Sequence, residues 1–473
     1  MTREDFLNIT EYIGVIIKGT PFENHVFAVG GSVRDFYMGN DIKDIDLVID
    51  LPHGGVDFAN WCKEQEYTNT VVIYETYGTA MFKFKRFPDE EIECVMTRGE
   101  KYEDKESRNP VTVFADINED AIRRDLTINA LYYNVSTGEI LDLVGGRSDI
   151  DNHIIRTTNT NPDVVMDDDP LRILRVVRFA TRYGWEIEAK TYKSMKKYAK
   201  RLKIITKERI QAELNKILTC NNAVMGINYL HDVGAMRYVI PEFEECYGLT
   251  QNKYHFGDVA EHTLAVLDYH CKHYEPDVIE RLACLLHDIG KPATRSVKDG
   301  KIHFYDHEYV GVGIAIRIMK DLKYDNDTIK EVAFLIENHM RTKRAGPGAK
   351  YIKDKTLNKL LYQCGTFERF CSLMRIIDCD NMSHAEEHRI PDQYDCLVKK
   401  VSESEDHMRM FGYKLPVTGE DIMGTLNIGP GPIISEINKR LLNQAFMDPG
   451  ISRGRCIQLL PGIKKQAEQV LKK

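Results

Sequence analysis

The chain has 473 residues, enough for about three domains. Hydrophobic residues make up 43% of the sequence and charged residues 29%, a balance that is typical of packed globular proteins and excludes a disordered or fibrous chain. The formal net charge is −8, so a nucleic-acid partner has to bind a local basic surface and not the chain as a whole.

The sequence carries no signal for a membrane or for secretion. No window approaches the ~18 uninterrupted apolar residues of a membrane span. The N-terminal stretch MTREDFLNITEYIG has acidic residues where a signal peptide needs a basic start and an apolar core. The 11 cysteines form no CxxC pair, which argues against a disulfide framework and a zinc-thiolate site. We therefore expect a cytoplasmic protein with reduced thiols, and we predict no protein partner.

Strand and helix patterns alternate in the first 150 residues. Residues 25–31 (HVFAVGG) indicate a buried strand that ends in a glycine pair, and 32–38 a short helix. Further strands are predicted at 44–50, 70–74, 79–85, 91–97 and 139–144, with a helix near 56–65. This segment is predicted to be a mixed α/β domain.

From about residue 165 the hydrophobic period becomes helical, and no long strand is expected afterwards. A second all-helical stretch is predicted from about 255 to 400, with breaks at 289–292 (IGKP) and 345–348 (AGPG). Short helices separated by loops follow. The predicted fold class is therefore a multidomain α/β plus all-α protein, with domains at 1–150, 151–250, 251–400 and 401–473.

Asp44 and Asp46 form the first candidate site. Two residues apart on a strand, they point to one face and can share divalent cations. The same spacing occurs at 149/151, 167/169 and 378/380, and most such pairs lie in solvated turns, so the spacing alone is weak evidence.

The position of this pair strengthens the prediction. Gly30, Gly31 and Ser32 can offer backbone N–H groups and a hydroxyl to a triphosphate at a helix N-terminus; the alternative is a tight turn. Glu93 can supply a third carboxylate that deprotonates a hydroxyl or completes the metal shell; the alternative is an exposed strand residue.

Two basic runs are candidates for binding nucleic-acid phosphates. They cover residues 190–209 (KTYKSMKKYAKRLKIITKER) and 341–359 (RTKRAGPGAKYIKDKTLNK). For either run alone, a solvated helix face is an equally good interpretation.

The segment GGSVRDFYMGNDIKDIDLVID resembles the catalytic head of the bacterial-type (class II) tRNA nucleotidyltransferases and poly(A) polymerases. Further motifs of that family follow in the same order: IRRDLTINALYYN at 122–134, DLVGGRSDI at 142–150, DDPLRILRVVRF at 168–179 and KERIQAELNKIL at 207–218. The resemblance implies a polymerase-beta-like head with a mixed sheet, followed by a helical neck and body. One departure is Asp168-Asp169, where the base-reading motif usually starts with Glu-Asp.

The resemblance also assigns roles to residues. Asp44 and Asp46 would hold Mg²⁺ and, with Glu93, would be catalytic. Asp169 and Arg172 would read the incoming base. An alternative for Asp169 is a simple helix N-cap before Pro170. The expected nucleotide-binding residues are Gly30, Gly31, Ser32, Arg34, Arg123, Asp125, Asn129, Asp169, Arg172, Arg175 and Arg178.

A second candidate site is centred on the segment RLACLLHDIGKP at 281–292, which contains His287 and Asp288. The ordered set H…HD…H…H…D resembles the HD phosphohydrolase superfamily, which implies a divalent metal such as Ni²⁺, Mn²⁺ or Mg²⁺ and a phosphoester substrate. The ligands expected are His262, His287, Asp288, His307, His339 and Asp380. Asp378 competes with Asp380, and His255, His303 and His384 are second choices. A lone doublet, His231-Asp232, is interpreted as an ordinary helix end.

Together these motifs predict a template-independent enzyme that adds CMP and AMP, from CTP and ATP, to tRNA 3′ ends, with an HD phosphohydrolase domain. The alternatives are a bacterial poly(A) polymerase, which shares the head, and an HD phosphohydrolase with a nucleotide-sensing head. A non-catalytic RNA-binding protein is the weakest alternative, since the head keeps its acidic and base-reading residues.

Overall fold

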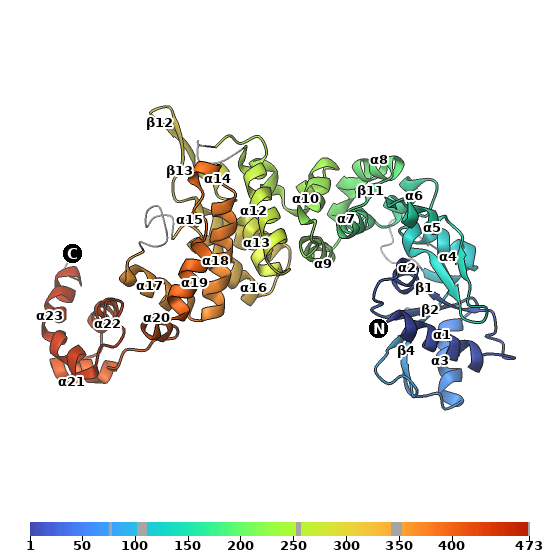
Figure 1. The fold of residues 1–473 in the computed structure, drawn as a ribbon, viewed down its shortest axis with the longest axis horizontal. Helices are drawn as coiled ribbons and strands as arrows, with labels where there is room; N and C mark the ends of the chain where they lie inside the picture. Colours follow the sequence, from blue (N-terminus) through green and yellow to red (C-terminus); the bar gives the residue numbers. More distant parts are fainter. Residues whose placement is uncertain (75–77, 102–110, 252–256, 342–351, 472–473) are drawn as a thin grey trace. The chain divides into compact units, whose positions relative to one another are not determined.

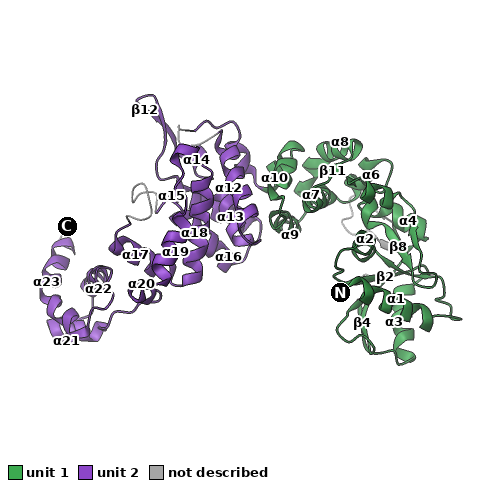
Figure 2. Cartoon of the chain, in the orientation of Figure 1, with its two compact units in different colours: residues 1–239 green, residues 240–473 purple. Residues whose placement is uncertain are grey.

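The structure is a computed structural model that describes residues 1–74, 78–101, 111–251, 257–341 and 352–471 (Figure 1). His255, the break at 345–348 and the central part of the second basic run lie outside the described residues. The chain forms two compact units, Met1–Val239 and Ile240–Lys473 (Figure 2). A mixed-sheet head and helical segments that follow it are present, so the predicted fold class is confirmed.

A seven-stranded mixed sheet with the order β3-β4-β5-β2-β1-β8-β9 forms the head. Only β2 and β5 pair in parallel in this sheet, and the other neighbours are antiparallel. Its strands are β1 (Val26–Val29), β2 (Ile45–Ile49), β3 (Thr68–Tyr74), β4 (Thr79–Phe84), β5 (Ile92–Met96), β8 (Leu131–Asn134) and β9 (Ile140–Asp142). The sequence analysis predicted all of these strands except β8.

Helices pack on this sheet. The helix α2 (Gly31–Met38) follows β1, and α3 (Gly54–Glu64) follows β2, as predicted. The helix α1 (Arg3–Ile16) was not predicted, although Phe6, Ile9 and Ile13 have helical spacing and are buried. The Phe6 ring lies 4.8 Å from that of Phe36, so α1 is part of the head core.

Several short elements complete the head. They are the hairpin of β6 (Arg98–Lys101) and β7 (Val111–Phe114), α4 (Ile117–Arg123), the 3-10 turn η2 (Thr127–Asn129) and α5 (Gly146–Asp151). The helices α6 (Pro162–Asp168), α7 (Arg172–Tyr183), α8 (Ala189–Tyr198), α9 (Lys207–Leu218), α10 (Ala223–Asp232) and α11 (Met236–Val239) follow in the same unit, with a short pair of β10 (Ile154–Ile155) and β11 (Glu186–Ile187).

The second unit is mainly helical. It contains α12 (Val259–His273), α13 (Val278–Leu286), α14 (Lys291–Thr294), α15 (His307–Asp321), α16 (Asn326–Asn338), α17 (Asp354–Cys364), α18 (Phe367–Met382) and α19 (Gln393–Ser402). The all-helical prediction is wrong at one place, because β12 (Arg295–Lys298) and β13 (Lys301–Phe304) form a hairpin. Asp299 and Gly300 both have positive φ, the conformation that an Asp-Gly hairpin turn requires.

The C-terminal segment has its own core. Three helices, α21 (Gly419–Leu426), α22 (Pro432–Ala445) and α23 (Arg453–Leu471), build it, with Ile422, Ile437, Leu441 and Leu460 buried at its centre. The helix α20 (Glu405–Arg409) precedes this core and contacts α17 and α19. No disulfide bond joins the described cysteines. Among the described residues, no helix is both long and apolar enough for a membrane span.

Candidate functional site

Three carboxylates share one face of the head sheet. Asp46 on β2 and Glu93 on β5 are register partners of the parallel pair, so their side chains point the same way. Asp44 lies one residue before β2 and two before Asp46. Asp44 and Glu93 are exposed and Asp46 is half-buried. The three side chains therefore form an acidic row open to the surface.

Within this row, Asp46 lies in the negative field of the other two carboxylates. Burial and the charges of Asp44 and Glu93 raise the pKa of Asp46 to about 6, and Arg124 offsets only part of the effect. A divalent cation bound by these oxygens would remove the repulsion, and oxygen ligands are those that Mg²⁺ prefers. The donor set therefore fits Mg²⁺.

The turn between β1 and α2 lies beside the acidic row, because Val29 is the register partner of Asp46. Gly30 has φ 75°, which favours glycine, and it precedes the first turn of α2. The Ser32 hydroxyl donates to the Val29 carbonyl at 3.0 Å, so its proton is already engaged. The backbone N–H groups of this turn are the donors left for a phosphate.

A buried polar network joins the head motifs to α7. Arg34 donates to Asn129 Oδ1 at 2.6 Å and pairs with Asp35 at 2.8 Å. Asn129 donates in turn to Asp125, and Arg175 pairs with the other oxygen of Asp125 at 2.6 Å. The network links three sequence motifs that were predicted to bind one nucleotide.

Two arginines of α4 and its C-cap are held by one carboxylate. Arg123 and Arg124 each lie 2.9 Å from Asp120, which also accepts from the Tyr132 hydroxyl. Burial opposes ionisation of Asp120, but the two arginines outweigh it and lower its pKa to about 2. Arg172 donates to the Arg123 carbonyl at 2.8 Å. These contacts orient the guanidinium groups.

A cavity of about 290 Å³ lies among these groups. It is lined by Val95, Arg98, Arg123, Arg124, Asp125, Asp169, Leu171, Arg172, Arg175 and Arg209. Six arginines against two carboxylates make it strongly basic, as a triphosphate site requires. Arg34, Asn129 and Arg178 do not line it; Arg178 pairs with Glu213 at 3.2 Å.

Asp169 has two partners at the cavity wall. One carboxylate oxygen accepts from the Leu171 N–H at 3.1 Å, as a helix-capping residue does, and the other pairs with Arg209 at 2.7 Å. Arg98 and Arg209 were not singled out from the sequence. Arg209 lies in the first turn of α9, within the motif KERIQAELNKIL. Its place in a family motif was the signal by which the sequence could have identified it as a site residue.

In the second unit, four histidines are oriented by the backbone. The Nδ1 atoms of His287, His307, His339 and His384 lie 2.6 to 3.0 Å from the carbonyl oxygen three residues earlier. Burial opposes protonation of His287, but the adjacent Asp288 carboxylate outweighs it and raises the pKa of this histidine. A carbonyl only accepts, so each Nδ1 carries a proton, which leaves Nε2 as the ring nitrogen that can bind a metal when the ring is neutral. This is the arrangement that metal-binding imidazoles require.

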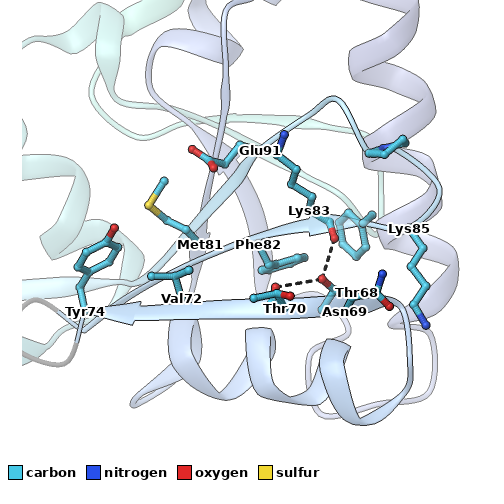
Figure 3. A pocket seen from close by; sticks show the side chains of 12 residues that line it. Thr68, Asn69, Thr70, Val72, Tyr74, Met81, Phe82, Lys83, Lys85 and Glu91 are labelled. Carbon is cyan, nitrogen blue, oxygen red and sulfur yellow. Dashed lines mark hydrogen bonds between the residues drawn. The ribbon is translucent and has the colours of Figure 1, made fainter.

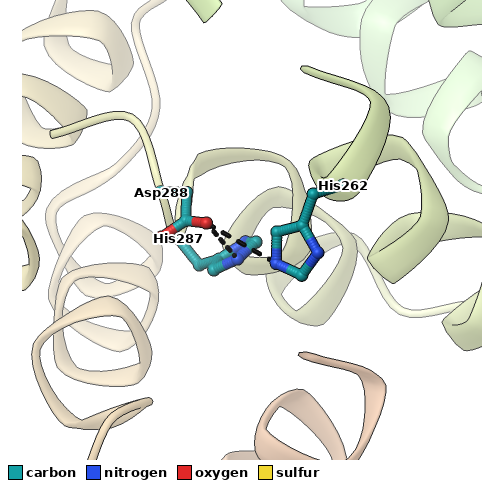
Figure 4. Close-up of side chains that lie close together, drawn as sticks. All are labelled: His262, His287 and Asp288. Atoms are coloured by element: carbon teal, nitrogen blue, oxygen red, sulfur yellow. Dashed lines mark ion pairs between the residues drawn. The ribbon is translucent and has the colours of Figure 1, made fainter. Parts of the chain in front are cut away.

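Three of these histidines, His287, His307 and His339, gather around Asp288 together with His262. One group of ligand atoms within 4.8 Å of one another comes from His262, His287 and Asp288 (Figure 4), and a second comes from Asp288, His307 and His339. All five residues are buried. His262 Nε2 also lies 3.2 Å from Asp380. The ligands come from α12, the C-terminal end of α13, the start of α15, the end of α16 and α18.

Lys291 also borders this cluster. It lies in the motif RLACLLHDIGKP, but no role was predicted for it from the sequence. Its buried ammonium lies 2.6 Å from Asp288 Oδ2. Burial lowers the pKa of His262 to about 4 and that of His339 to about 3, so both are neutral at pH 7 and able to bind a metal. Neutral imidazoles and carboxylates fit a divalent cation.

Other candidates lie apart from this cluster or at its edge. Asp378 accepts from the Tyr274 hydroxyl at 2.8 Å. His303 lies on β13 and stacks on Tyr305. His384 Nε2 is 3.7 Å from Asp380. His231 is at the end of α10.

An acidic row beside an arginine-rich cavity on a mixed sheet, followed by a His/Asp cluster, defines a nucleotidyltransferase-type head joined to a metal-binding helical domain. Three family models match the chain: "Poly A polymerase head domain" over residues 26–156, "Probable RNA and SrmB- binding site of polymerase A" over 184–247, and "HD domain" over 259–364.

The names of similar proteins agree with these matches. The chain is 31% identical over 367 residues to the "Multifunctional CCA protein" of Pseudomonas paraeruginosa, covering 73% of this chain and 80% of that protein. It is 29% identical over 328 residues to the "A-adding tRNA nucleotidyltransferase" of Deinococcus radiodurans, covering 68% and 70%. The fold matches the CCA-adding enzyme of Bacillus stearothermophilus in complex with CTP with a TM-score of 0.69, at 18% identity over 98% of each chain. The chain belongs to the bacterial-type (class II) family of tRNA nucleotidyltransferases and poly(A) polymerases with an HD domain, which confirms the predicted resemblance.

Proposed function

We propose that this chain is a template-independent tRNA nucleotidyltransferase that adds CMP and AMP to tRNA 3′ ends and so builds the terminal CCA. The observation that carries the proposal is the acidic row of Asp44, Asp46 and Glu93 next to the arginine-rich cavity. The relatives' names, which include a CCA protein and an A-adding enzyme, support this substrate class. We place this activity in the cytoplasm.

The chemistry follows from the positions of these side chains. Asp44 and Asp46 hold Mg²⁺, which when bound lowers the pKa of the RNA 3′-hydroxyl and stabilises charge on the triphosphate. Glu93 accepts the hydroxyl proton or completes the metal shell. The backbone N–H groups after Gly30 and the cavity arginines hold the phosphates in place as pyrophosphate leaves.

Base choice is assigned to the cavity wall. Arg172 can donate to the acceptors of a cytosine ring, and a carboxylate such as Asp169 can accept from the exocyclic amine that C and A share. The contact of Asp169 with Arg209 holds that carboxylate at the cavity. Arg34, Asp125, Asn129, Arg175 and Arg178 position the wall through their network of ion pairs and hydrogen bonds.

The tRNA backbone is assigned to the basic run 190–209. Lys193, Lys196 and Lys200 on α8 and the turn after it are exposed. The family model described as a probable RNA-binding site overlaps this run. The positive face supplies the sequence-independent attraction that phosphate contacts require.

The test uses tRNAs that end before the CCA, after C and after CC, each with CTP, with ATP and with both. The proposal expects CTP use on the first two and ATP use on the third, with addition stopping after the terminal A. Continued extension with ATP alone would instead show a poly(A) polymerase, and ATP use on the CC end only would show an A-adding enzyme.

A second activity is favoured by the buried cluster around Asp288. We propose that the HD domain is a metal-dependent phosphohydrolase for phosphoester ends such as 2′,3′-cyclic phosphates, with His262, His287, Asp288 and Asp380 holding Ni²⁺, Mn²⁺ or Mg²⁺ and with His307 and His339 beside them. Hydrolysis of a cyclic phosphate by the purified chain with each metal in turn tests this.

A further inference from the structure

A groove of about 390 Å³ lies over the β3–β4 edge of the head sheet (Figure 3). Its lining includes Thr70, Val72 and Tyr74 of β3 together with Met81 and Lys83 of β4. Within each strand these residues alternate, so they stand on one face of the sheet. No part of the nucleotide site described above uses this groove.

The groove is continuous with the acidic row. Val72 is the register partner of Met81, and Met81 is the register partner of Glu93. Glu93 is in turn the partner of Asp46. Register partners share a face, and neighbouring strands lie about 4.8 Å apart. The centre of the groove floor is therefore on the order of 10 Å from the catalytic carboxylates, on the same open surface.

The strand β5 shows which side of the acidic row the groove occupies. Glu91, Glu93 and Val95 alternate along the chain and share one face. Glu91 lines the groove, and Val95 lines the arginine-rich cavity. The catalytic carboxylate Glu93 thus lies between the two hollows.

We propose that this groove binds the 3′-terminal nucleotide of the RNA acceptor. The inference rests on the proposed function. In phosphoryl transfer the attacking and leaving oxygens are roughly in line, so the attacking 3′-hydroxyl of the acceptor and the leaving pyrophosphate lie on opposite sides of the reacting α-phosphorus. With the triphosphate in the arginine-rich cavity, the acceptor end comes from the side of the groove.

The chemistry of the lining fits a single-stranded RNA end. Tyr74 and Val72 are 46% and 48% exposed and offer an aromatic ring and an apolar surface to a base. Lys83 and Lys85 are exposed and can bind phosphates. Stacking tolerates any base. That tolerance suits an acceptor whose last base changes with each addition.

The first test measures addition of CMP to a tRNA that ends before the CCA. Tyr74→Ala is expected to raise KM for the tRNA on the order of tenfold, with KM for CTP within twofold of the wild type. Tyr74→Phe keeps the ring and is expected to keep the wild-type KM. The matched control is Tyr309→Ala, which removes a tyrosine of similar exposure (44%) in the second unit. An unchanged KM for tRNA in Tyr74→Ala overturns the inference.

The second test does not depend on activity. A tRNA with 4-thiouridine as its last nucleotide is cross-linked to the full chain, and the modified peptide is mapped. Attachment within 68–74 or 81–91 is the expected result, and attachment only elsewhere overturns the inference. If the wild type adds no nucleotide but the cross-link maps to the groove, the proposed function fails and the groove assignment stands. A dimer that Tyr74→Ala converts to monomer would show a surface for a second copy and would also overturn it.

Discussion

The head site and the HD site differ in donor groups and in surroundings: the head row consists of carboxylates alone, whereas the HD cluster combines histidines with carboxylates. In the head, Asp44 and Glu93 are exposed, and burial together with repulsion from these two carboxylates raises the pKa of Asp46 to about 6. In the HD unit the ligands are buried, and Lys291 contacts Asp288. The carboxylates of the head row are therefore open to the surface, whereas the His/Asp cluster of the HD unit is enclosed by the protein. An open site suits a macromolecular end, and a closed one suits a small phosphoester.

The largest expected effect comes from substitutions that inactivate the head site and leave the HD site intact. Asp44→Ala or Asp46→Ala should lower nucleotide addition by roughly 10³-fold or more, because the metal contributes several kcal/mol to transition-state stabilisation. Binding of tRNA, measured by a gel-shift assay, should stay close to that of the wild type. Asp41→Ala, a nearby exposed carboxylate, is the control. Normal addition by either variant would contradict the assignment of the acidic row.

The converse experiment breaks the HD site alone. His287→Ala with Asp288→Ala should abolish metal-dependent hydrolysis, and the increase in Tm on adding Mn²⁺ or Ni²⁺ should become smaller, because metal bound at the HD cluster no longer stabilises the folded state. CCA addition should continue. The chain offers its own control, His231→Ala with Asp232→Ala, which removes the other HD doublet. Hydrolysis at the wild-type rate by the first double variant would show that the cluster is structural.

A finer comparison separates catalysis from base choice within the head. Asp169→Ala or Arg172→Ala should reduce discrimination among CTP, ATP and UTP on the order of 10- to 100-fold, since a good base contact is worth about 1–3 kcal/mol. Competition assays with mixed nucleotides measure this. If Asp169 acts only as a helix cap, its variant should lose roughly 1 kcal/mol of stability and retain its selectivity.

The smallest effect concerns pH. The pKa of Asp46 is raised from 3.8 to about 6 in the fold, so the protonated carboxyl is the form that the fold favours. That stability is fully present below pH 4 and is lost as the pH rises through 6. With a chelator present, Asp46→Asn should therefore be more stable than the wild type at pH 8, by about 1 kcal/mol after solvent screening, and no more stable at pH 4. Thermal melts at the two pH values decide this, and an equal difference at both would count against it.

Much of the fold and the family could be predicted because the motifs are local. The strand-turn-helix around Gly30, the strand with Asp46 and the helix end at His287-Asp288 each depend on neighbouring residues. The hairpin at Asp299-Gly300 was missed although its turn signal is local, because helical patterns surround it. The strand β8 was not predicted, because the segment 122–134 that contains it was interpreted as a family motif and not for its secondary structure.

The contacts between side chains from distant segments could not be predicted from the sequence. The pairing of Asp169 with Arg209, the contact of Lys291 with Asp288 and the bond from Ser32 to Val29 depend on where helices and turns meet. The register that aligns Val72, Met81 and Glu93 depends on strand order, which alternation alone does not fix.

The most direct test of the account is the mass of the product that forms on a tRNA lacking its CCA end, with CTP, ATP and Mg²⁺ present. The wild-type chain should extend this tRNA by two C and one A and then stop, and Asp46→Asn should leave it unextended. No extension by the wild type, a long A tail, or an equal product from Asp46→Asn would contradict the claim that the acidic row of the head catalyses CCA addition.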